Sequence, residues 1–216
     1  MQERTKRIIM SAAGVVLCGF SVGMFKYASL GIDPFQDLMA GLNTVIPIRF
    51  GTLYVIVNAV LLLFALFFDR SKIGIATFIN LFLLGYIADF GMAVCRQLFP
   101  APSLLLRIVI LIAGIVLLCL SSSMYMTADL GVSTYDAIAL IWAKKQKKLP
   151  FPVCRILTDL SCIVIGALLT VLSGKTNGLF GGVIGIGTLI TAFFMGPLIS
   201  WFDETVSKPL LNGRTE

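Results

Sequence analysis

The chain contains the segment GVVLCGFSVGMFKYASLG at residues 14–31 and, one hundred positions later, GIVLLCLSSSMYMTADLG at residues 114–131. The two segments share eight identical residues without a gap, and both end in a Leu-Gly pair. Further along, with small insertions, GIAT at residues 74–77 aligns with GIGT at residues 185–188. Self-similarity at a fixed spacing indicates that the chain consists of two copies of one unit.

The composition places both copies in a membrane. Of the 216 residues, 58% are hydrophobic and only 13% are charged, about half the charged share of a soluble domain. Mean hydropathy is +0.97, and apolar runs such as 55–68 and 104–120 are typical of segments that contact lipid. The sequence therefore predicts an all-α, polytopic transmembrane helical bundle.

Six segments are long enough to cross a hydrocarbon core of about 30 Å at 1.5 Å per residue. We expect the first repeat, residues 1–100, and the second repeat, residues 101–204, to hold three spans and one short helix each, and residues 205–216 to form a cytoplasmic tail. The short helices are predicted at 33–46 and 133–148. The spans are predicted at about 8–28, 50–69, 73–96, 103–126, 151–173 and 178–202.

The number of crossings in each repeat sets the relative direction of the two copies. Three crossings make the second copy run upside down, which is the inverted-repeat architecture of many secondary transporters. If the short helices also cross, each copy has four spans and the repeats are parallel. With six spans, twelve Lys and Arg residues fall on the side of the N-terminus and five on the other, which places both termini in the cytoplasm.

The short helices follow Gly31 and Gly131. Asp33 precedes a proline and is suited to cap the first helix, while Ser133 and Asp136 have the spacing of a capping box for the second. Two interpretations stay open. The helices either lie flat among lipid headgroups, or the glycines break the chain so that each helix N-terminus points into a cavity and holds a polar or anionic ligand.

Polar residues inside a predicted span mark the second feature of interest. Arg155 lies one helical turn before Asp159, and Asn58 aligns with Asp159 in the repeat. Such a pair either holds helices together or serves function, and intramembrane charges favour a functional hypothesis. The predicted substrate-binding residues are Asp159, Arg155, Asn58, Asp136, Ser133, Asp33, Gly31 and Gly131.

The sequence also argues against several kinds of chemistry. It has no His, which excludes HExxH zinc sites and Ser/His nucleophile pairs. Its five Cys residues show no CxxC spacing and are interpreted as small core residues. We therefore expect that the protein has no catalytic residue, metal or cofactor and that it is not an enzyme. The net charge of +6 is explained by Lys and Arg that meet anionic lipids, without nucleic acid.

Several motifs of the chain form a recognisable set: LGIDPF at 30–35, LGVSTYD at 130–136, FGT at 50–52, Asp159 and GIGT at 185–188. Together they resemble the motifs of the YczE/YyaS/YitT family of bacterial integral membrane proteins, over nearly the whole chain. Where the family pattern reads Leu-Gly-x-x-Pro-Trp-Asp, this chain has Phe35-Gln36 in place of Trp-Asp and Thr134-Tyr135 in place of Pro-Trp, so Asp136 is the better match. The resemblance implies a polytopic fold in the bacterial cytoplasmic membrane.

These observations predict a secondary transporter or permease for a small polar or anionic metabolite, with its site where the repeats meet. Its partners would be membrane lipids and an unidentified small-molecule substrate, and a homo-oligomer is left open. The alternative is a non-transporting accessory or sensory membrane protein that acts through helix packing and the basic segment 144–148.

Overall fold

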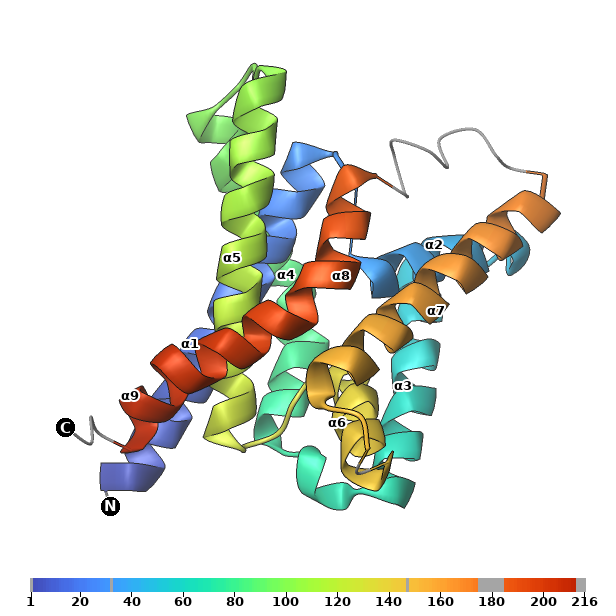
Figure 1. The fold of residues 1–216 in the computed structure, drawn as a ribbon. Helices are drawn as coiled ribbons and strands as arrows, with labels where there is room; N and C mark the ends of the chain where they lie inside the picture. Colours follow the sequence, from blue (N-terminus) through green and yellow to red (C-terminus); the bar gives the residue numbers. More distant parts are fainter. Residues whose placement is uncertain (1, 32, 147, 175–184, 213–216) are drawn as a thin grey trace.

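The computed structural model describes residues 2–31, 33–146, 148–174 and 185–212, and within these ranges the ordered elements are all helical. The predicted all-α bundle is confirmed (Figure 1). The elements are α1 (Gln2–Ala28), α2 (Pro34–Val45), α3 (Phe50–Phe68), η1 (Arg70–Lys72), α4 (Ile75–Leu98), α5 (Leu104–Ala128), α6 (Thr134–Gln146), α7 (Phe151–Leu172), α8 (Ile186–Phe202), η2 (Asp203–Ser207) and α9 (Lys208–Asn212).

The described part contains five helices that are long and apolar enough to cross a membrane: α1, α4, α5, α7 and the continuous segment Ile186–Leu211. The apolar helix Thr52–Phe68 is shorter. Large apolar side chains point outward from these helices, among them Phe67 and Leu172, which are 90% and 80% exposed. Outward apolar side chains suit a lipid environment, so the chain is a multi-pass membrane protein.

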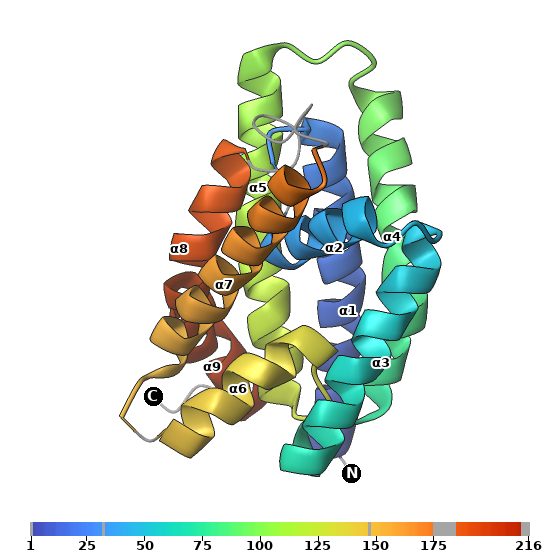
Figure 2. The same cartoon turned by 90° about the vertical axis from the view of Figure 1, so that its right-hand side faces the viewer.

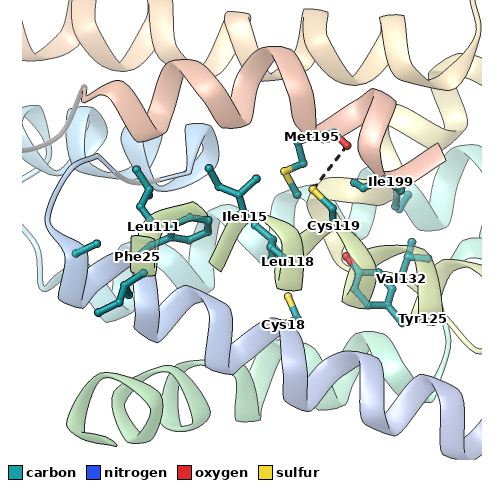
Figure 3. Packing of buried hydrophobic residues seen from close by; sticks show 14 of the residues in the cluster. Cys18, Phe25, Leu111, Ile115, Leu118, Cys119, Tyr125, Val132, Met195 and Ile199 are labelled. Carbon is teal, nitrogen blue, oxygen red and sulfur yellow. Dashed lines mark hydrogen bonds between the residues drawn. The ribbon is translucent and has the colours of Figure 1, made fainter. Parts of the chain in front are cut away.

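The centre of the bundle is an antiparallel pair formed by α1 and α5. In Figures 1 and 2, α1 rises from the end of the molecule that holds the N-terminus, and α5 runs beside it in the opposite direction. Gly14 allows this close approach, since a Cβ there would lie 3.0 Å from the carbonyl oxygen of Ser121. Figure 3 shows Cys18 of α1 and Leu118 of α5 in one apolar cluster with Met195 of α8.

Each short helix packs against the opposite half of the chain. α2 lies along α7, with Gly41 so close to Gly166 that a Cβ on Gly41 would be 2.6 Å from its Cα, and α6 contacts both α3 and α7. The first turns of both helices are buried. Figure 2 shows α2 and α6 at different heights, with α6 nearer the end that holds the N-terminus. Their first turns therefore contact the protein interior rather than lipid headgroups.

The loops that precede the short helices dock reciprocally. The carbonyl oxygen of Leu30, after α1, accepts a hydrogen bond from the backbone N–H of Gly187 at 2.9 Å. The carbonyl oxygen of Leu130, after α5, accepts one from the backbone N–H of Ala76 at 3.1 Å. Each Leu-Gly pair thus binds the start of a helix in the other half of the chain.

The C-terminal residues differ from the predicted tail. The chain stays helical after Phe202 through η2, a π-helical turn, and through α9. Ser207 is fully buried and its Oγ lies 2.5 Å from Oγ of Ser123, while Leu211 packs with Met10. Pro209 is the second residue of α9 and follows the π-helical turn closely. The residues up to Asn212 therefore belong to the bundle.

Asp69 lies in the connection between α3 and η1, outside the membrane spans. Its Oδ2 forms an ion pair with Nζ of Lys144 of α6 at 2.7 Å. This contact and a hydrogen bond from Ser71 lower the pKa of Asp69 to about 2. A depressed carboxyl pKa stabilises the fold above the pKa of the unfolded chain, about 4, and this contribution is lost as pH falls towards 2. We expect Asp69→Asn to cost less than about 1 kcal/mol at pH 7, because surface ion pairs contribute little. Thermal unfolding in detergent should give a lower midpoint for Asp69→Asn than for the original protein at pH 7, and this difference should disappear near pH 2. An equal difference in midpoint at both pH values would contradict the lowered pKa of Asp69.

Candidate functional site

Both short helices begin at one cavity of about 80 Å³ inside the bundle. Asp33 and Gln36 line it from the start of α2, and Ser133 and Asp136 line it from the start of α6. Arg155 of α7 completes the charged part of its wall. The cavity thus lies where the two halves of the chain meet.

A buried charged cluster forms one side of this cavity. The Arg155 guanidinium donates to the carboxylate of Asp136 and, through Nε, to Oδ2 of Asp159 at 3.2 Å. The side chains of these three residues are 4% exposed or less. Tyr135 donates its hydroxyl to Oδ1 of Asp159 at 2.5 Å, and the guanidinium carbon lies 4.6 Å from the centre of its ring. Two carboxylates therefore share one guanidinium at membrane depth, where unpaired charges are costly.

Asp136 receives further hydrogen bonds that fix its carboxylate. Ser133 donates its hydroxyl to Oδ2 of Asp136 at 2.6 Å and accepts from the backbone N–H of Asp136 at 3.1 Å. The Tyr125 hydroxyl of α5 donates to the same carboxylate oxygen. The start of α6 is therefore linked by side chains to both α5 and α7.

The α2 side of the cavity has a different polar pattern. Oδ1 of Asp33 accepts from the backbone N–H groups of Phe35 and Gln36 at 3.1 and 3.2 Å, so this carboxylate caps α2. The ring of Phe35 stacks on that of Tyr135, exactly one hundred positions later, with ring centres 4.9 Å apart. The two helix starts therefore touch at corresponding positions of the aligned segments.

Asn58 of α3 contacts the start of α6 rather than Asp159. Its Oδ1 accepts from the Thr134 hydroxyl at 2.6 Å, and its Nδ2 donates to the carbonyl oxygen of Tyr54 at 2.8 Å. The aligned residues Asn58 and Asp159 thus bind neighbouring side chains, Thr134 and Tyr135, of the same short helix.

The structure brings five of the predicted site residues to the cavity: Asp33, Asn58, Ser133, Asp136 and Arg155. Asp159 lies behind Arg155 and is fully buried.

The other two predicted residues, Gly31 and Gly131, belong to the docked loops and are not among the described residues that line the cavity. Their φ angles of +121° and +108° favour glycine. Gly31 lies beside Thr188, and Gly131 lies beside Thr77. Both glycines therefore lie in the contact between the two halves of the chain.

The sequence did not single out several residues of the site. The hydroxyls of Tyr125 and Tyr135 donate hydrogen bonds to the carboxylates of Asp136 and Asp159, respectively. Thr77 and Asn80 of α4 line the cavity. A signal was present, because Thr77 and Asn80 are polar, lie three residues apart on one helical face, and occur within an apolar span.

Asp37 of α2 is the least satisfied buried group. It is fully buried, its backbone packs beside Gly166 of α7, and neither carboxylate oxygen has a hydrogen-bond partner within the described ranges. An ionised carboxylate in such a place would cost several kcal/mol. We therefore assign a proton to Asp37 in this state.

Comparison with known proteins gives the family. A model described as "Family of unknown function (DUF6198)" matches residues 5–204. The chain belongs to this family. It is 27% identical to "Uncharacterized protein YyaS" of Bacillus subtilis (strain 168), over 92% of this chain and 93% of that protein. It is also 27% identical to "Uncharacterized membrane protein YczE" of the same organism, over 98% and 91% of the two chains. An uncharacterized protein of Haemophilus influenzae is 24% identical over 96% and 87%.

These relatives confirm the family resemblance predicted from the Leu-Gly motifs. They also agree with the membrane assignment, since one relative is described as a membrane protein. No solved structure matches this chain.

Proposed function

We propose that this protein is a secondary transporter that moves a small polar solute across the bacterial cytoplasmic membrane, with its binding site in the central cavity. The observation that carries this proposal is the buried cluster of Asp136, Arg155 and Asp159 beside a cavity lined by both halves of the chain. Intramembrane charges that face a cavity mark transport pathways in many membrane proteins.

The arrangement of the helices supports an inverted repeat. The aligned helices α1 and α5 run in opposite directions, and the Leu-Gly loops dock reciprocally. The short helices also pack reciprocally, α2 on α7 and α6 on α3. Two inverted copies around a central site permit alternating access, in which one copy rocks against the other.

Two larger cavities support a path on each side of the site. One, of about 280 Å³, extends from the central cavity to the Lys26–Asp89 ion pair. The two cavities share the lining residues Val22, Gln36, Tyr54, Leu81 and Leu84.

The second of these larger cavities has a volume of about 480 Å³ and is lined in part by Met126, Ile199 and Ser200. These residues align with residues 26, 88 and 89, which line the 280 Å³ cavity, the first path. It shares no described lining residue with the central cavity. The hydrogen-bonded side chains of Tyr125, Asp136 and Arg155 line the central cavity on the second-repeat side. We infer that this state is open towards the first path and closed towards the second.

The end that carries the N-terminus is assigned to the cytoplasm. In Figure 1 this end also holds η1, the connection from α6 to α7, and α9. Lys and Arg gather in these segments, as in cytoplasmic loops of bacterial membrane proteins. The described part of the basic segment 144–148 belongs to this end. Lys144 binds Asp69 and Lys145 lies 3.7 Å from the ring centre of Phe68, so both contact the protein itself; Lys147 lies outside the described residues.

The proposal is tested by labelling Cys18, a native thiol that lines the central cavity. The other four cysteines are replaced by alanine, the protein is reconstituted in oriented vesicles, and a membrane-impermeant thiol reagent is added on either side. A transporter exposes one site to both sides in turn, so we expect Cys18 to react from both. Ser122→Cys, at a second position of the cavity wall, serves as an independent probe. Labelling of both probes from one side only would contradict transport and favour an accessory role.

A further inference from the structure

We propose that the central cavity binds a small monovalent organic cation, held between the carboxylate of Asp33 and the aromatic rings of Phe35 and Tyr54. The proposal rests on the proposed function in taking this cavity as the solute site. The sequence predicts a polar or anionic metabolite; this proposal keeps a polar solute and replaces the anionic one with a cation.

The charge balance of the cavity carries the argument. Asp33 and Asp136 line the cavity and Asp159 lies directly behind it, giving three carboxylates. Arg155 supplies one positive charge, and each short-helix N-terminus supplies a partial charge of about +0.5. With all groups ionised, the site is about one positive charge short. Asp136 and Asp159 are buried and Asp33 is half-buried. Charge held away from water is costly unless it is compensated, and one monovalent cation compensates it.

An anion finds no free cationic group among the described residues of the same site. Arg155, the only cation among the described lining residues, already binds Asp136 and Asp159. The first N–H groups of α2 are bound by Asp33, and Ser133 binds the N–H of Asp136 in α6. An anionic solute would have to displace these carboxylates from their own donors.

The cavity wall has the chemistry that recognises an ammonium or guanidinium group. Asp33 uses Oδ1 to cap α2, and its Oδ2 has no hydrogen-bond partner in the described part of the chain. Phe35 and Tyr54 line the same space, and aromatic rings attract cations. Tyr135 also lines it, but its ring already contacts both the Phe35 ring and the Arg155 guanidinium. A volume of about 80 Å³ suits a small solute.

Asp37 does not alter this balance. It is not among the described residues that line the cavity, and its unpartnered carboxyl group is assigned a proton. A proton on one of the cavity carboxylates is the competing way to neutralise the site, and the experiment below separates it from a bound cation.

The test is protection of Cys18 in the purified full chain, in detergent, with the other four cysteines replaced by alanine. The labelling rate is measured with increasing methylammonium or guanidinium chloride at millimolar concentration, against sodium chloride and sodium acetate at equal ionic strength. We expect either organic cation to slow labelling in a saturable way, by about tenfold at ten times its dissociation constant, because about one site in ten is then empty. The midpoint of thermal unfolding should rise over the same range.

Variants show whether the carboxylate of the cavity is responsible. Asp33→Asn should abolish both the protection and the thermal shift, whereas Asp69→Asn, a carboxylate in the η1 loop, should keep them. Protection by acetate, protection that survives Asp33→Asn, or no protection and no thermal shift with either cation would overturn the proposal. The last result would indicate a protonated site. Labelling of Cys18 from both sides of a vesicle needs no ligand, so failure here is distinguishable from failure of the transport proposal.

Discussion

Arg155→Leu is expected to lower the free energy of unfolding by about 3–5 kcal/mol, because it leaves the carboxylates of Asp136 and Asp159 buried together without a cation. Leucine fills most of the volume of the arginine side chain, so the loss of stability is caused by the missing positive charge rather than by a new cavity. The measurement is thermal or chemical unfolding in detergent, with the yield of folded protein as a second readout. Arg155→Lys should recover only part of the loss, since an ammonium cannot reproduce the planar fork that binds two carboxylates.

Removal of the stranded charges provides the matched control. The triple variant Arg155→Leu with Asp136→Asn and Asp159→Asn carries no charge in the cluster and should be clearly more stable than Arg155→Leu alone. Such recovery is the non-additivity expected of residues in one network. If Arg155→Leu were as stable as the original protein, or if the triple variant were less stable than the single one, the cluster would not be the buried, paired group described here.

Parts of this cluster follow from the sequence and parts do not. Arg155 and Asp159 are four residues apart in a helix, so their contact follows from helical spacing alone. The contact of Arg155 with Asp136 depends on how α6 packs on α7, which local spacing does not determine. The same holds for Tyr125, which reaches Asp136 from a third helix. The sequence thus located the charges at membrane depth, and tertiary packing decided which of them meet.

The structure around the Leu-Gly motifs was likewise predictable from the sequence only in part. The sequence predicted short helices after Gly31 and Gly131, and α2 and α6 begin at Pro34 and Thr134. It also aligned GIAT at 74–77 with GIGT at 185–188. It did not reveal that each Leu-Gly loop binds the GIxT segment of the opposite half, because a pattern repeated within both halves leaves open which copies pair. Part of the last predicted span, at 178–184, lies outside the described residues.

This reciprocal docking makes Gly74 and Gly185 the glycines where a side chain should do most harm. A Cβ on Gly74 would lie 2.6 Å from the carbonyl carbon of Leu130, and one on Gly185 would lie 2.5 Å from that of Leu30. Both obstacles are backbone, which cannot rotate away as a side chain can. We therefore expect Gly74→Ala and Gly185→Ala each to cost about 3 kcal/mol or more, at or above the usual range for overpacking, in detergent unfolding.

Gly85→Ala is the matched control, because a Cβ there meets nothing within 4 Å. Alanine favours helix over glycine by up to about 1 kcal/mol, so this variant should be as stable as the original protein or more stable. Since the two docking contacts have the same geometry, Gly74→Ala and Gly185→Ala should be similar in cost, and the double variant should not fold. A mild effect of either substitution would mean that its loop moves away freely, and the two halves would then not be joined by the Leu-Gly contacts.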